Sequence, residues 1–336
     1  MIGVVLAAGR GERMHPLSAE RPKALLPTLD VPQLTWALAR LKAAGVRRAW
    51  VNTRGGWGGH GDEMSVSREV ERAAAVLGLE VGVSVEPAEP LGTAGALGRL
   101  RAELDETFLL VNADVASSVP LGQLVEAHRA AGPPATLVGI PTRDRADLVA
   151  EDGWVVELLD RSRRVGAGHV YAGIGVFEPA VLGYVPDGVS HLFDTVMGGL
   201  VRDAGARGLA LFEWTGYWRD LADPAAHLRV NLEALSGVIP RPPGLPALQG
   251  PCQRWDALAY VGPGAEVGGV DLACAVVGAG ARVEPGTRLE RCVVWGGAQV
   301  GRGIFADAVL TPTAVVNVAV AGSGPAARSR LSRRIR

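Results

Sequence analysis

The sequence predicts a doubly wound α/β domain followed by a short parallel β-solenoid, and three observations support this fold class. Residues 2–236 alternate short apolar runs with helix-like segments, a pattern typical of βαβ units. A proline-rich stretch at residues 237–251 cannot continue a helix and reads as a semi-rigid linker. Beyond it, aliphatic residues recur every six positions, which indicates coils of short stacked strands.

The α/β part begins with "IGVVLA", a continuous apolar run typical of a strand that is covered on both faces. Pro32 suits the first turn of the helix that follows, and Gly45 suits its C-terminal cap. The expected strands are residues 2–7, 47–52, 79–85 and 107–112, and the expected helices are residues 32–45, 62–78 and 95–104.

The solenoid is predicted from its spacing, with turn sequences such as "GAGAR" and "EPGTR" between the aliphatic positions. The aliphatic residues of this period are Val261, Val267, Val277, Val283, Leu289 and Val300. A glycine-rich loop is the alternative, but it would not keep so regular a spacing. Cys274 and Cys292 lie 18 residues apart. We therefore expect them to stack about 4.8 Å apart as reduced, buried side chains.

These patterns divide the chain into four expected parts. They are an α/β domain at residues 1–236, a linker at 237–250, a solenoid at 251–318 and a basic tail at 319–336. The tail contains "RSRLSRRIR", and we expect it to be a disordered, solvated segment.

Composition excludes several classes of protein. The formal charge of −1 gives no reason to expect nucleic acid or a membrane surface as partner. The N-terminus lacks the features of a signal peptide, and no apolar run approaches the length of a spanning helix. The three cysteines include no CxxC pair, so neither a zinc site nor a disulfide framework is indicated. We expect a cytoplasmic protein with reduced thiols.

The loop after the first strand, "AAGRGERMHPLSAERPKALLP", combines glycines with positively charged side chains. Gly9 and Gly11 allow the backbone N–H groups to approach anionic oxygens closely, and Arg13 and Lys23 add two cations. Ligands of open α/β sheets bind at the carboxyl ends of the strands, where this loop begins. A dinucleotide fingerprint and a Walker loop are both absent. The loop therefore predicts a polyphosphate cradle.

Nine positions of this loop fit the signature G-x-G-x-R-[LM]-x-P-L-[ST]-x-x-x-P-K. They are Gly9, Gly11, Arg13, Met14, Pro16, Leu17, Ser18, Pro22 and Lys23. With this signature the chain resembles the sugar-1-phosphate nucleotidyltransferases, or NDP-sugar pyrophosphorylases. Three later segments resemble the same family: "EPAEPLGTAGAL", "FLLVNADV" and "GYWRDLADPAAHLRVN".

The resemblance implies a Rossmann-like nucleotidyltransferase domain followed by a left-handed β-helix. It also implies an Mg²⁺-dependent transfer of a nucleotidyl group from a nucleoside triphosphate to a sugar-1-phosphate, with release of pyrophosphate. Asp114 and Asp220 would hold the metal. Arg13 would neutralise the β- and γ-phosphates, and Lys23 the α-phosphate.

The same resemblance implies the residues that bind the nucleotide. They are Leu6, Ala7, Ala8, Gly9, Gly11, Glu86, Gly92 and Thr93. The Glu86 carboxylate fits guanine, whose N1–H and exocyclic amine are both donors. The alternative for Glu86 is an exposed charge beside Pro87.

The sugar side departs from the family pattern. The family's E-K-P is replaced by Asp160, Arg161 and Ser162, so Arg161 would bind the sugar phosphate from a different position. Gly173 is retained and would permit close approach to the sugar, whereas Asp147 stands where the family has glycine. The nucleotide half matches the family better than the sugar half.

Several functions remain open at this point. The segment at residues 86–97 favours GTP and mannose-1-phosphate, as in mannose-1-phosphate guanylyltransferases. A uridylyltransferase for an amino-sugar-1-phosphate is a close alternative, and a catalytically silent regulatory subunit that binds a nucleotide sugar is another. Acyl transfer by the solenoid is disfavoured because no histidine lies in it. We expect the solenoid to join copies of the chain into a homo-oligomer.

Overall fold

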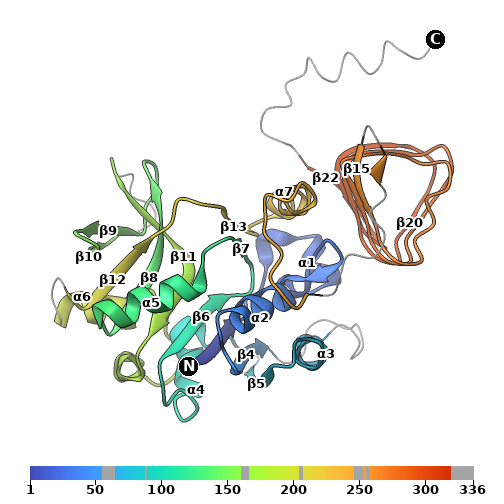
Figure 1. The fold of residues 1–336 in the computed structure, drawn as a ribbon. Coiled ribbons are helices and arrows are strands. Elements are labelled where there is room, and N and C mark those ends of the chain that lie inside the picture. Colours follow the sequence, from blue (N-terminus) through green and yellow to red (C-terminus); the bar gives the residue numbers. More distant parts are fainter. Residues whose placement is uncertain are drawn as a thin grey trace.

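The computed structural model describes residues 1–54, 65–87, 89–159, 166–203, 207–245, 253–254 and 257–318 (Figure 1). The expected basic tail and part of the expected linker lie outside these residues. Among the helices that the structure describes, none is both long enough and apolar enough to cross a membrane.

A nine-stranded sheet in the order β5-β4-β1-β6-β11-β8-β12-β10-β9 forms the centre of the α/β part. Its strands are β1 (Ile2–Leu6), β4 (Arg48–Arg54), β5 (Glu80–Glu86), β6 (Phe108–Asn112), β8 (Ala135–Thr142), β9 (Leu148–Glu151), β10 (Trp154–Leu158), β11 (Gly168–Phe177) and β12 (Leu209–Glu213). The four strands β5, β4, β1 and β6 run parallel, as the apolar runs predicted. The rest of the sheet is mixed, because β11 runs antiparallel to both of its main neighbours, β6 and β8.

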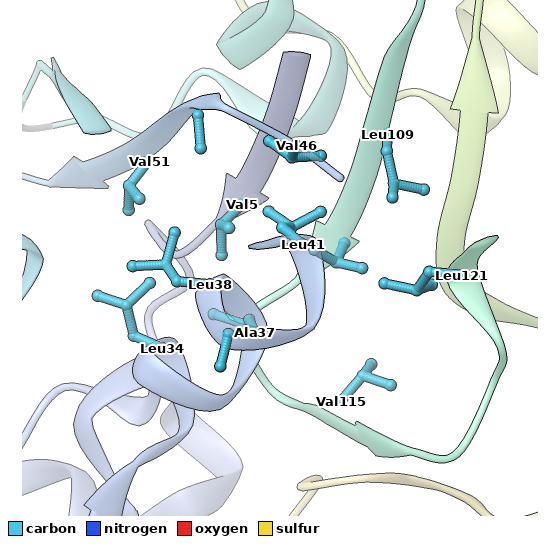
Figure 2. Close-up of a cluster of buried hydrophobic side chains, with 14 of the residues drawn as sticks. Val5, Leu34, Ala37, Leu38, Leu41, Val46, Val51, Leu109, Val115 and Leu121 are labelled. Carbon is cyan, nitrogen blue, oxygen red and sulfur yellow. The ribbon is translucent and has the colours of Figure 1, made fainter. Parts of the chain in front are cut away.

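Helical elements cover both faces of this sheet. Val5 of β1 packs with α2, α3 and α5, and its neighbour Val4 packs with elements of the opposite face. Figure 2 shows the first of these layers, where Leu34, Leu38 and Leu41 of α2 lie against the strands. The helical elements of the two layers are α2 (Gln33–Ala43), α3 (Val66–Leu77) and α5 (Leu121–Ala131), and α4 (Gly92–Arg99), η4 (Pro179–Tyr184), η5 (Phe193–Met197) and α6 (Gly198–Asp203).

Smaller elements connect this core to the rest of the chain. The first loop, which we define as residues 7–26, folds into η1 (Glu12–Met14), α1 (Leu17–Glu20) and η2 (Lys23–Leu25). Two short strand pairs lie outside the main sheet, and a last helix follows them. These elements are β2 (Pro27–Thr28) with β3 (Val31–Pro32), β7 (Val115–Ser117) with β13 (Trp218–Asp220), and α7 (Pro224–Leu235).

The C-terminal part consists of short strands stacked on one another (orange in Figure 1). They are β14 (Gln253–Arg254), β15 (Ala257–Val261), β16 (Asp271–Ala273), β17 (Ala275–Val277), β18 (Arg282–Val283), β19 (Arg288–Val294), β20 (Gln299–Val300), β21 (Ile304–Leu310) and β22 (Val315–Asn317). Strands β15, β17, β19 and β21 pair in parallel, one turn of the chain above the next. Aliphatic residues of the six-residue period, including Val277, Val283 and Leu289, form the interior of the stack. We call these stacked turns the C-terminal coils.

The expected stacking of Cys274 on Cys292 is wrong. Val276 pairs with Val293, so this turn takes 17 residues and places Cys292 beside Ala275. Cys274 has a positive φ of 53° and is exposed, whereas Cys292 is buried. Turn length is set by local backbone geometry in each corner, so a strict 18-residue repeat does not hold.

The C-terminal coils pack against the α/β part through α7 and the first loop. Leu228 and Val230 of α7 share one buried cluster with Val276, Val293 and Trp295 of the coils. In Figure 1, α7 lies between the coils and the sheet. This shared cluster joins the two parts of the chain through a continuous apolar core.

Candidate active site at the carboxyl ends of the strands

A few buried side chains hold the first loop in place, and its two cations, Arg13 and Lys23, differ in exposure. Met14 and Leu17 are fully buried, and they anchor the two short helical turns. Gly11 has a φ of +65°, which glycine adopts without the steric cost that a Cβ would add. The Arg13 side chain is 73% exposed, whereas that of Lys23 is only 12% exposed. Lys23 is therefore a largely buried cation, whereas Arg13 is a solvent-exposed one.

Lys23 joins two aspartates that are far apart in the sequence. Its Nζ donates to Asp114 Oδ2 at 2.6 Å and to Asp220 Oδ1 at 3.4 Å. Arg13 approaches the other oxygen of Asp220, with 4.0 Å between Nη2 and Oδ2. Arg13, Lys23, Asp114 and Asp220, all singled out from the sequence, therefore lie together at one place.

Backbone pairing positions the two carboxylates. Asp114 follows β6 in the turn before β7, and Asp220 ends β13. Strands β7 and β13 are antiparallel with Asp220 opposite Val115, and the Leu221 N–H donates to the Asp114 carbonyl at 2.9 Å. The side chains converge because a short two-stranded ladder brings their backbones side by side.

The environment of Asp220 disfavours its charged form. Burial is the largest cause that raises the pKa of Asp220, and the nearby Asp114 raises it further. Lys23 and Arg13 oppose this shift. An additional cation between the two carboxylates would stabilise their charged forms.

Glu86 lies in a buried clasp rather than at the surface. Its side chain is 4% exposed, so the alternative of an exposed charge beside Pro87 is wrong. Glu86 Oε1 accepts from Asn52 Nδ2 at 2.6 Å, and Oε2 accepts from the Leu91 N–H at 2.9 Å. Asn52 Oδ1 in turn accepts from the Ala7 N–H at 2.6 Å. The clasp connects the ends of β1, β4 and β5 to the start of α4.

Two adjoining cavities open at this edge of the sheet. The first, which we call the loop cavity, has a volume of about 410 Å³ and extends from the first loop to Asp114. Six of the eight expected nucleotide-binding residues line it: Leu6, Ala8, Gly9, Glu86, Gly92 and Thr93. Ala7 and Gly11 are not among its lining residues, and the Ala7 N–H is already bonded to Asn52.

The second cavity, which we call the β11 cavity, has a volume of about 880 Å³. It shares Leu6, Thr93, Asn112 and His191 with the loop cavity, so the two form one continuous hollow. Its remaining lining is mostly apolar and includes Leu158, Leu159, Tyr171, Phe193 and Met197.

Gly173 of β11 lies beside Asn112, which lines both cavities. It has a φ of +72°, and a Cβ there would come within 2.7 Å of Asn112 Nδ2, so the close approach needs glycine. Asp147 is buried, and its Oδ2 accepts from the Tyr171 N–H at 2.9 Å. The expected sugar-phosphate residues Asp160 and Arg161, with Ser162, lie outside the described residues.

The lining and clasp residues that were not identified from the sequence include Asn52, Asn112, Tyr171 and His191. Asn52 and Asn112 occupy the same kind of position as Asp114, at or near the end of a buried strand. Applied to every strand, the strand-end criterion would have found both. Tyr171 and His191 carry no such signal, because they reach the hollow only through the packing of β11 and the segment before η5.

The donor set fits a divalent cation of the Mg²⁺ type. Mg²⁺ is usually bound by one or two carboxylates, together with water and substrate phosphates. Asp114 and Asp220 point at one common cation, the Lys23 ammonium, which demonstrates that their oxygens converge. Within the part of the chain that the structure describes, no group of three or more His, Cys, Asp or Glu side chains is arranged to hold a metal. The remaining ligands would have to come from substrate and solvent.

Comparisons with known proteins agree with this site. The nucleotidyl transferase family matches residues 2–148. The mannose-1-phosphate guanylyltransferase of Mycobacterium tuberculosis is 30% identical over 306 residues, which cover 89% of this chain and 81% of that protein. The chain therefore belongs to the nucleotidyl transferase family, among the sugar-1-phosphate nucleotidyltransferases, and is a transferase.

Other relatives show how the family varies. The N-acetylmuramate alpha-1-phosphate uridylyltransferase of Neisseria meningitidis is 30% identical over 241 residues, covering 66% of this chain and 93% of that protein. A putative glucose-1-phosphate thymidylyltransferase from Bacillus anthracis, solved with sucrose, superposes with a TM-score of 0.59 at 18% identity, covering 70% and 95% of the two chains. HddC from Yersinia pseudotuberculosis, solved with GMP-PN, gives a TM-score of 0.56 at 19% identity, covering 69% and 99%. These two structures establish the fold alone.

Proposed function

We propose that this protein transfers a guanylyl group from GTP to mannose-1-phosphate, giving GDP-mannose and pyrophosphate. The observation that carries the proposal is the convergence of Lys23, Asp114 and Asp220 beside the loop cavity, with 2.6 and 3.4 Å between Lys23 Nζ and the two carboxylates. A mannose-1-phosphate guanylyltransferase that matches most of the chain supports the choice of substrates.

In the proposed reaction, an oxygen of the sugar phosphate attacks the α-phosphorus of GTP. The bond between the α-phosphorus and the bridging oxygen breaks as the new bond forms, and pyrophosphate leaves with the electron pair. Lys23 would bind the α-phosphate after separating from one carboxylate, and the exposed Arg13 would neutralise the β- and γ-phosphates. Mg²⁺, held by Asp114 and Asp220, would supply further charge neutralisation.

The base would occupy the end of the loop cavity formed by Glu86, Gly92 and Thr93. Each oxygen of Glu86 already accepts one hydrogen bond, and a carboxylate oxygen can accept a second. Guanine would use these free lone pairs, whereas uracil offers a single N–H. Glu86 therefore favours GTP over UTP.

The sugar phosphate would occupy the β11 cavity, next to Gly173 and Asn112. Asp160 and Arg161 would contact its phosphate from the segment between β10 and β11. The cavity is larger than a hexose phosphate requires, and its lining is mostly apolar. A uridylyltransferase for an amino-sugar-1-phosphate is therefore the second candidate, since an N-acyl substituent would fill apolar space.

We also propose a division into a catalytic domain at residues 1–236, a linker at 237–250 and a left-handed β-helix at 251–318. The β-helix would join copies of the chain, which light scattering on the purified protein can test. The sparse cysteines fit a reducing compartment such as the cytoplasm.

The test is pyrophosphate release with Mg²⁺ across a matrix of five nucleoside triphosphates and four sugar phosphates. The sugars are mannose-1-phosphate, glucose-1-phosphate, N-acetylglucosamine-1-phosphate and N-acetylmuramate-1-phosphate. We expect GTP with mannose-1-phosphate to give the highest kcat/KM. Asp114→Asn should lower it by about 10²-fold or more, because one carboxylate of the metal site is lost.

Asp105→Asn is the matched control, because Asp105 is exposed and pairs only with Arg48 in the described residues. Its activity should equal that of the wild type. Highest activity with UTP and an amino-sugar phosphate would replace the first candidate by the second. A blank matrix combined with calorimetric binding of GDP-mannose would instead favour a silent regulatory subunit.

A further inference from the structure

The first loop contacts the C-terminal coils through buried side chains that do not line the loop cavity. Met14 and Leu17, together with Leu26, belong to the same buried cluster as Trp295 and Val293 of the coils. Leu221, the residue after Asp220, belongs to this cluster as well. The first loop, which carries Arg13 and Lys23, and the segment that carries Asp220 thus share one buried cluster with side chains of the C-terminal coils.

Trp295 makes a specific contact with the segment that leads into Lys23. The Arg21 guanidinium lies over the Trp295 ring, 4.9 Å from its centroid. Trp295 is 1% exposed, and its Nε1–H donates to His227 Nε2 at 3.2 Å. Burial lowers the pKa of His227 to about 3, so its imidazole is neutral and can accept this bond. The hydrogen bond to His227 therefore fixes the orientation of the Trp295 ring that Arg21 contacts.

A second contact holds the neighbouring residue. Glu20 Oε1 accepts hydrogen bonds from the hydroxyls of Thr311 and Thr313, the latter at 2.6 Å. Thr311 is 6% exposed and also accepts the Ala314 N–H at 2.9 Å, so its hydroxyl is oriented by its own turn. Glu20 and Arg21 precede Lys23 by three and two residues, and the rigid Pro22 lies between Arg21 and Lys23.

We propose that Trp295, with Thr311 and Thr313, positions Lys23 from outside the catalytic domain, so that the C-terminal coils act as a clamp on the first loop. The role in activity rests on the proposed nucleotidyl transfer. Trp295 touches neither substrate nor reacting atoms and acts through Arg21 and Pro22 on Lys23. Only the stiff residue Pro22 separates Arg21 from Lys23. Holding Arg21 in place therefore also holds the Lys23 ammonium near the two aspartates.

The test compares Trp295→Leu, which removes the aromatic face, with Trp295→Phe, which keeps it. We expect Trp295→Leu to lower kcat/KM for the nucleotide about tenfold, as expected for loss of a desolvated cation–π contact. The KM for the sugar phosphate should stay within about twofold, because the β11 cavity is formed by other elements. Trp295→Phe should recover most of the activity. Amide hydrogen exchange of residues 12–25 should be faster in Trp295→Leu than in the wild type, and it should be unchanged in Trp295→Phe.

Leu289→Ala is the matched control for general destabilisation. Leu289 is fully buried in the interior cluster of the coils, which contains no residue of the first loop. It should lower thermal stability while leaving exchange in residues 12–25 and KM for the nucleotide unchanged. Equal effects of Leu289→Ala and Trp295→Leu would overturn the proposal, because the clamp would then be ordinary stability.

A second variant protects the test against misfolding. Thr311→Val removes the hydroxyl donated to Glu20 at nearly constant shape, and we expect a loss of about threefold in kcat/KM with faster exchange in residues 12–25. Wild-type exchange and activity in this variant would also count against the clamp. An inactive wild type would refute the proposed function, whereas the exchange measurements would still decide whether the coils hold the loop.

Discussion

Lys23 occupies the position on which the candidate site depends. It is the least exposed of the four charged side chains there, and its ammonium bridges Asp114 and Asp220. Without a cation between them, the two neighbouring carboxylates would repel each other, which would favour protonation of one of them. Lys23 therefore keeps the site charged and ready for a polyanionic substrate.

Replacing Asp220 by asparagine should separate stability from activity. A raised pKa means that folded Asp220 binds its proton at a pH where the unfolded chain has released it. The folded state then holds more protons than the unfolded state, so stability falls as pH rises from about 4 through the raised pKa. We expect Asp220→Asn to unfold about 2 °C above the wild type at pH 8, with the difference vanishing near pH 4, although pyrophosphate release is lost.

Thermal unfolding followed by circular dichroism across this pH range measures the effect. Asp105→Asn, at an exposed position, should follow the wild type at every pH. A wild type that is more stable than Asp220→Asn at pH 8 would show that the ion pair with Lys23 outweighs the cost of burying the charge.

At the scale of elements, the Glu86 clasp determines the shape of the loop cavity. The Asn52 side chain accepts from the end of β1 and donates to Glu86, which in turn accepts from the N-terminal end of α4. Strand ends on a parallel sheet have unpaired backbone groups, and these side chains satisfy them in place of water. The clasp thus holds four elements, β1, β4, β5 and α4, together around one wall of the cavity.

Glu86→Gln should weaken this arrangement. One of the two donors, Asn52 Nδ2 or the Leu91 N–H, would face an NH₂ group instead of an oxygen, and a buried unsatisfied group costs about 1–3 kcal/mol. We expect the free energy of unfolding in urea to fall by that amount and KM for the nucleotide to rise. Glu80→Gln, an exposed change on the same strand, should alter neither quantity.

At the scale of the whole molecule, the Asp30 carboxylate joins the α/β part to the C-terminal coils at a row of glycines in the coils. Asp30 Oδ2 accepts from the Ala279 N–H at 2.6 Å. It lies against Gly262, Gly278 and Gly296, one from each of three successive turns of the coils. Burial is the largest influence on Asp30 and raises its pKa, which the bond from Ala279 opposes. Glycine at these corners leaves room for the carboxylate.

Gly278→Ala should disturb this contact. A Cβ there would lie 2.5 Å from the Gly296 nitrogen and 2.8 Å from Asp30 Oδ1, so the coils would have to shift. We expect a loss of about 1–3 kcal/mol in unfolding free energy, typical of overpacking. Gly268→Ala is the control, because a Cβ at Gly268 meets no atom within 4 Å. Equal stability of the two variants would show that the contact is dispensable.

Features that depend on neighbours in the chain could be predicted from the amino-acid sequence alone. The apolar runs predicted the parallel strands β1, β4, β5 and β6, and the pattern is continuous in β1 and β6 because these strands are buried on both faces. The glycines, prolines and cations of the first loop predicted an anion-binding turn, because these properties belong to the residues themselves. Four charged residues named from short motifs, Arg13, Lys23, Asp114 and Asp220, lie together in the structure.

Features that depend on long-range pairing became apparent only in the folded molecule. No local signal predicts the antiparallel course of β11 or the hydrogen bond between Glu86 and Asn52. The same holds for the 17-residue turn, which prevents Cys274 from stacking on Cys292. The contact of Trp295 with Arg21 joins residues far apart in the chain and arises from the packing of the coils against the first loop. Local pattern fixes which face a residue buries, but packing selects the partner that it meets there.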